Sequence, residues 1–162
     1  MKKYILDCKL DAEKLTGKQR KGIETLVSYL SSFRFGFQIC TYEKKEDRAL
    51  FESTFIKYTY DKDDLSAEDV DLFIMLCTEI VMGSHIQKTI DMLQGEQDRT
   101  LRDEDKLSMV LVEAINTART EHNACTKRQQ SLYKDLTEGR SERLSKQIQE
   151  TSSLLNLVSA WK

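Results

Sequence analysis

LSMVLVEAINTARTEHNACTKRQQSL, residues 107–132, carries the clearest periodic pattern in the chain. A stripe of apolar, small and polar residues recurs at intervals of three and four, at Leu107, Leu111, Ala114, Ala118, His122, Cys125, Gln129 and Leu132. Gly139 interrupts the pattern, and a second stripe follows Ser141, at Leu144, Ile148, Thr151, Leu155 and Val158. These intervals place side chains on one face of a helix, as in coiled coils. The spacing therefore predicts two helical arms in an antiparallel hairpin with its turn near Gly139.

The composition also favours long helices with short connections. The chain has 162 residues and six glycines but no proline, a residue that is common in loops and irregular strands. We expect a mainly α fold, with a helical domain over residues 1–100 and a coiled-coil-like hairpin over residues 101–162. Small and polar residues on the first stripe favour either close packing or a seam that another subunit completes. We therefore expect oligomerisation through Leu107, Leu111, Ala114, Ala118, Leu144, Ile148, Leu155 and Val158.

Caps and periodicity place several helices within residues 1–100. Thr16 and Gln19 have the spacing of a capping box, which predicts a helix over residues 17–32. Residues 44–60 have a helical pattern, although residues 56–60 also fit a strand. Asp61–Asp64 is expected to form a charged turn, after which Ser66 caps a helix with a wide apolar face. That helix either ends at Gly83 or continues to Leu93.

Two segments alternate with a period of two residues. One covers residues 3–10, and the other covers residues 33–41, where three phenylalanines alternate with polar residues and glycine. A period of two and aromatic side chains are typical of strands. One small β element built from these two segments is therefore an open alternative within the helical fold.

The sequence shows none of the usual catalytic or metal-binding patterns. Its two histidines, His85 and His122, do not stand at metal-ligand spacing from a cysteine. We predict no enzymatic activity, no cofactor and no metal site. The longest charge-free run, residues 151–161, is about half the length of a membrane-spanning helix. Since the four cysteines are scattered as in proteins with reduced thiols, we expect a cytoplasmic protein that does not enter a membrane.

Charge is distributed unevenly along the chain. Residues 51–105 carry 14 acidic and 5 basic side chains, whereas the segments on either side are mildly basic. Lysine and arginine near the start of a helix favour phosphate contacts, because the helix amides there already attract anions. The sequence has two such basic groups, one at the start of the first predicted helix and one around the predicted hairpin turn. Ion pairing on a solvated helix surface is the alternative interpretation of both groups. The candidate nucleic-acid contacts are Lys14, Lys18, Arg20, Lys21, Arg140 and Arg143.

Three features together resemble the small subunits of phage terminases. They are Leu15–Gln19 leading into a helix that contains Tyr29 and Leu30, the segment Phe55–Asp61, and the long helical hairpin that follows. The resemblance implies a non-enzymatic oligomer in the host cytoplasm that binds double-stranded viral DNA for genome packaging and regulates a large motor subunit. A helical adaptor or scaffold that binds a protein partner through its hairpin remains the alternative function.

Overall fold

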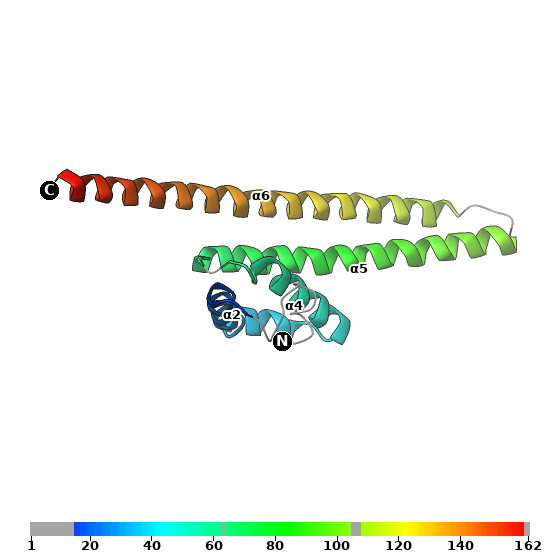
Figure 1. Cartoon of the computed structure of the whole chain (residues 1–162). Helices are drawn as coiled ribbons and strands as arrows, with labels where there is room; N and C mark the ends of the chain where they lie inside the picture. The colour runs from blue at the N-terminus through cyan, green and yellow to red at the C-terminus, as the bar shows by residue number, and fades with distance from the viewer. Residues whose placement is uncertain (1–14, 63, 105–107, 161–162) are drawn as a thin grey trace.

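The computed structural model describes residues 15–62, 64–104 and 108–160, without the side chains of residues 103–104 and 154–160. These ranges contain five helices and no strand, so the protein is mainly α (Figure 1). The helices are α2 (Gly17–Leu30), α3 (Phe33–Thr41), α4 (Lys45–Thr59), α5 (Ala67–Glu104) and α6 (Met109–Ala160).

Two helices begin at the caps that the sequence predicted. At the start of α2, the Thr16 backbone N–H donates to Gln19 Oε1 (2.8 Å), and the Gln19 N–H donates to Thr16 Oγ1 (3.3 Å). At the start of α5, the Ser66 N–H donates to Asp69 Oδ2 (2.9 Å), and the Asp69 N–H donates to Ser66 Oγ (3.2 Å). Each exchange satisfies backbone groups that have no partner within the helix, and so fixes where the helix begins.

The hairpin is present, but the predicted position of its turn is wrong. Figure 1 shows α5 and α6 lying side by side and antiparallel, and the chain reverses between Glu104 and Met109. Helix α6 continues through Gly139, where an added Cβ would come no closer than 3.9 Å to another side chain. One glycine inside a helix costs only about 1 kcal/mol, which the surrounding helix-forming residues overcome. The predicted boundary between the helical domain and the hairpin, at residues 100 and 101, falls inside α5.

Residues 33–41 form helix α3, so the alternative of a β element is wrong for this segment; residues 3–10 lie outside the described part of the chain. The Ser32 side chain accepts a hydrogen bond from the Phe35 N–H (3.3 Å) and caps the helix. Phe35 is buried, whereas Phe33 and Phe37 are exposed and stack one helical turn apart. Alternating aromatic residues also fit a short helix with one buried and one exposed face. Residues 56–59 likewise continue α4 instead of forming a strand.

The core lies where α2, α3 and α4 cover the first half of α5, and Leu136 of α6 also belongs to it (Figure 1). Phe51 and Phe55 of α4 are fully buried, together with Cys77 of α5. The Phe35 ring completes this cluster with its centroid 4.9 Å from that of Phe55. Helix α5 continues without a break through Gly83, and its second half extends beyond these helices toward Glu104 beside α6.

Helix α6 is longer than its partner and projects past the start of α5 (Figure 1). The 52 residues of α6 and the 38 of α5 correspond to about 78 Å and about 57 Å at a rise of 1.5 Å per residue. Every described side chain from Ser141 to Ser153 is exposed. The fold therefore has a compact end with a bare helix extending from it.

Candidate functional site

A groove lies where the end of α4 and the start of α5 meet α6. Its volume is about 330 Å³. The floor is apolar and aromatic, built by Tyr58, Phe73, Tyr133 and Leu136, and its outer edge consists of Leu144 and Ile148 on the projecting part of α6. The Tyr58 and Tyr133 rings, whose centroids are 6.1 Å apart, bring α4 against α6. The groove is thus the inner end of the exposed face of α6.

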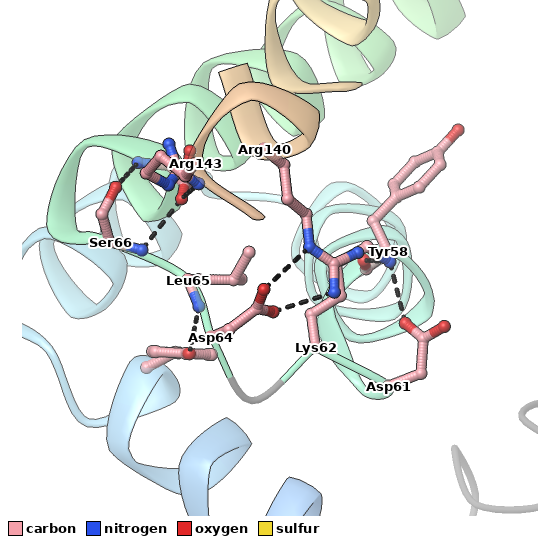
Figure 2. Close-up of polar contacts among 10 residues, drawn as sticks. Tyr58, Asp61, Lys62, Asp64, Leu65, Ser66, Arg140 and Arg143 are labelled. Carbon is pink, nitrogen blue, oxygen red and sulfur yellow. Dashed lines mark hydrogen bonds and ion pairs between the residues drawn. The ribbon is translucent and has the colours of Figure 1, made fainter. Parts of the chain in front are cut away.

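Two arginines of α6 hold the connection between α4 and α5 at the rim of this groove. Arg140 donates from Nη2 to Asp64 Oδ1 (2.9 Å) and from Nε to Asp64 Oδ2 (3.2 Å), which is a bidentate pair. Arg143 donates to Asp69, whose side chain is only 5% exposed and also caps α5. Figure 2 shows both arginines reaching from α6 toward this connection. We call these two ion pairs the arginine clamp.

Contacts at the rim and on the floor of the groove shift the pKa values of Asp64 and Tyr58. Partial burial disfavours the charged form of Asp64, but the hydrogen bonds and charge of Arg140 outweigh it, so the pKa of Asp64 is lowered. Burial raises the pKa of Tyr58, and the neighbouring Cys77 and Tyr133 act in the same direction. At neutral pH the rim therefore carries an ionised pair, and the floor stays uncharged.

The first stripe predicted from the sequence packs against α5 of the same chain. The Cys125 thiol and the Gln129 amide both donate to the Glu79 backbone carbonyl, at 3.1 and 2.9 Å. Gly83 permits this close approach, since a Cβ there would lie 3.1 Å from Gln129 Nε2. Arg128 reinforces the seam through an ion pair with the Glu79 carboxylate (3.0 Å). This seam is therefore already complete within one chain.

The predicted oligomerisation residues accordingly separate into two groups. Ala118 is buried and Leu111 and Ala114 are half-buried on the part of α6 that lies beside α5. By contrast, Leu144 is 40% and Ile148 is 69% exposed on the projection. Leu107 and the side chains of Leu155 and Val158 lie outside the described part of the chain.

The predicted nucleic-acid contacts also occupy two separate places. Lys18, Arg20 and Lys21 are exposed near the start of α2, and Lys14 lies outside the described residues. The end of α2 is the part that reaches the clamp, because the Leu65 N–H donates to the Tyr29 hydroxyl (3.2 Å). Lys18 lies three helical turns before Tyr29, about 16 Å away. The structure therefore does not bring the α2 cations together with Arg140 and Arg143.

A histidine–aspartate contact that the sequence analysis missed joins α4 to α5. His85 Nε2 lies 2.8 Å from Asp47 Oδ1, and the Asp47 side chain is only 6% exposed. The hydrogen bond from His85 lowers the pKa of Asp47; burial opposes this, and the charges of His85, Lys88 and Lys44 assist it. The pair lies within the packed body, where it fixes the two helices relative to each other.

Within the residues that the structure describes, metal-ligand clusters and membrane-spanning helices are both absent. There, no three histidine, cysteine or acidic side chains are grouped so as to hold a metal ion. None of the helices in the same ranges is both long and apolar enough to cross a membrane. The chain matches no protein-family model, no curated protein and no solved structure.

Proposed function

We propose that this chain is a non-enzymatic DNA-binding protein that assembles with copies of itself, as the resemblance to small terminase subunits implies. The observation that carries the proposal is the projecting part of α6, where Leu144 and Ile148 lie exposed on one face. Large apolar side chains gathered on an otherwise polar surface are typical of contacts with other proteins. In the proposed role, this projection builds the assembly, and the compact end carries the DNA contacts.

The proposed DNA contacts are the exposed cations near the start of α2. Lys18, Arg20 and Lys21 lie within the first turn and a half of the helix, where free amide groups add a positive potential. Such contacts bind phosphates without reading the base sequence. Arg140 and Arg143 are engaged by carboxylates of the same chain, so the proposal rests on α2 and not on the clamp.

Salt-dependent binding to a short DNA duplex, measured by fluorescence anisotropy, tests this proposal. Replacing Lys18 and Arg20 by alanine should weaken binding and reduce the magnitude of the salt slope by about 1.8, because each lost phosphate contact contributes about 0.9. The matched control replaces Arg119 and Lys127, two exposed cations of α6, by alanine and removes the same charge. No affinity at low salt, or equal weakening by the control, would contradict the proposal.

A protein adaptor remains the second candidate, and the ion pairing of the arginines favours it. Among the described residues, five arginines are paired with carboxylates of the same chain: Arg34, Arg99, Arg128, Arg140 and Arg143. Pairing reduces the positive potential that nonspecific DNA binding requires. If the duplex is not bound, the same projection and groove would serve a protein partner, which is the adaptor function.

A further inference from the structure

The apolar face of the α6 projection begins inside the groove. Residues spaced by three and four lie in line along a helix, and Tyr133, Thr137, Arg140, Leu144 and Ile148 follow this spacing and all line the groove. Thr151 continues the line on the projection, as do positions 155 and 158 by helical register. We call the part from Leu144 onward the projection stripe. The stripe is thus continuous with the groove along one face of α6, and its exposed apolar side chains begin at Leu144, beyond Arg140.

The projection stripe carries no charge that would repel an identical stripe. Between Leu144 and Ala160, the only charged residues are Lys146 and Glu150. At 100° per residue, both fall on the side of α6 away from the line of Leu144, Ile148 and Thr151. Two copies of this surface can therefore meet without like charges opposed. A partner of different sequence would gain no charge complementarity from such a neutral surface.

The body of the molecule favours one direction of pairing. At the inner end of the stripe, the arginine clamp holds Asp64 and Leu65 beside α6 at the level of Arg140. In a parallel pair, these connections of both copies would lie at the same level and compete for the space between the helices. In an antiparallel pair they lie at opposite ends, and the projection of each copy extends toward the groove of the other.

From this geometry we propose that two copies pair antiparallel along the projection stripe, about a two-fold axis at the level of Thr151. The two-fold axis makes the interface isologous, so each copy uses the same surface. The outer part of each projection covers Leu144 and Ile148 of its partner, which form the outer edge of the partner's groove. This inference rests on the self-assembly part of the proposed function and specifies which surface and which direction it uses.

Crosslinking through single cysteines distinguishes the two directions. In the antiparallel pair, the two Thr151 positions lie within about one turn of each other along the axis, whereas the two Leu144 positions are about 20 Å apart. In a parallel pair, both positions face their counterparts. The variants Thr151→Cys and Leu144→Cys are made in the full chain with Cys8 and Cys40 replaced by serine; the other two cysteines, Cys77 and Cys125, are buried.

A short bismaleimide should convert Thr151→Cys to a covalent dimer and leave Leu144→Cys monomeric on a denaturing gel. Both positions are exposed, so circular dichroism should show the wild-type helix content for each variant. Equal crosslinking at both positions would overturn the antiparallel pair while leaving self-assembly intact. No crosslink at either position, together with a monomeric wild-type mass, would overturn the self-assembly on which the inference rests. DNA binding through α2 is measured separately and is affected by neither result.

Discussion

The pair between Arg143 and Asp69 makes a quantitative prediction because one carboxylate has two roles. Asp69 caps α5 through the Ser66 N–H and also accepts a hydrogen bond from Arg143. Arg143→Ala removes only the ion pair, whereas Asp69→Ala removes both interactions. The Asp69 side chain is 5% exposed and that of Arg143 is 43% exposed, so this ion pair is intermediate between a fully exposed and a fully buried one.

The expected costs follow from these exposures. We expect Arg143→Ala to lower the free energy of unfolding by about 1–2 kcal/mol, between the values for exposed and buried pairs. Asp69→Ala should lower it by about 2–3 kcal/mol, because the cap contributes about 1 kcal/mol more. In the Asp69→Ala background, Arg143→Ala should cost close to nothing, since its partner is already absent.

Urea unfolding followed by circular dichroism measures all four proteins of this cycle. Arg99→Ala is the control, because Arg99 pairs with Glu96 on an open helix surface where both side chains are more than half exposed. It should cost less than about 0.5 kcal/mol. If Arg143→Ala costs the same with and without Asp69, the two residues are not coupled, and the arginine clamp does not hold the start of α5.

Three further predictions test other parts of the structure. Phe55→Ala should lower the free energy of unfolding by about 3–5 kcal/mol in the same urea assay, because the ring is fully buried; a cost under about 1 kcal/mol would contradict the core. Gly139→Ala should raise stability by about 0.5–1 kcal/mol, as expected inside a continuous helix with open space at Cβ, whereas a turn at Gly139 predicts a loss. Asp47 has a pKa lowered from 3.8 by His85, so its contribution is present above about pH 4 and is lost as the pH falls further. Urea midpoints measured between about pH 6 and pH 2.5 should therefore fall less for Asp47→Asn than for the wild type, and equal slopes would exclude the pair.

The parts of the fold that could be predicted from the sequence are those encoded by neighbouring residues. The Thr16–Gln19 capping box and the Ser66 cap formed as expected, because each depends on groups three residues apart. The predicted turn at Gly139 is wrong because the first stripe packs against Glu79 and Gly83 of α5. These residues lie some 46 positions away, and no local pattern shows that pairing.

The candidate site depends on contacts that the sequence leaves open. Asp64 could be assigned only to a charged turn, yet it meets Arg140 across 76 positions of the chain. The same contact changes the interpretation of Arg140, since a cation that looked available for phosphate is bound within the molecule. Ile148 is exposed in the structure, and oligomerisation through it stays a prediction.

Light scattering of the wild type beside two single variants tests the central claim, which is self-assembly through the projection stripe. Ile148→Glu places a charge on the stripe, and Gln149→Glu places the same charge one residue away, about 100° around α6 and off the stripe. The account predicts a wild-type mass of two or more chains, the same mass for Gln149→Glu, and a monomer for Ile148→Glu. A monomeric wild type at high concentration, or an Ile148→Glu variant that assembles like the wild type, would contradict it.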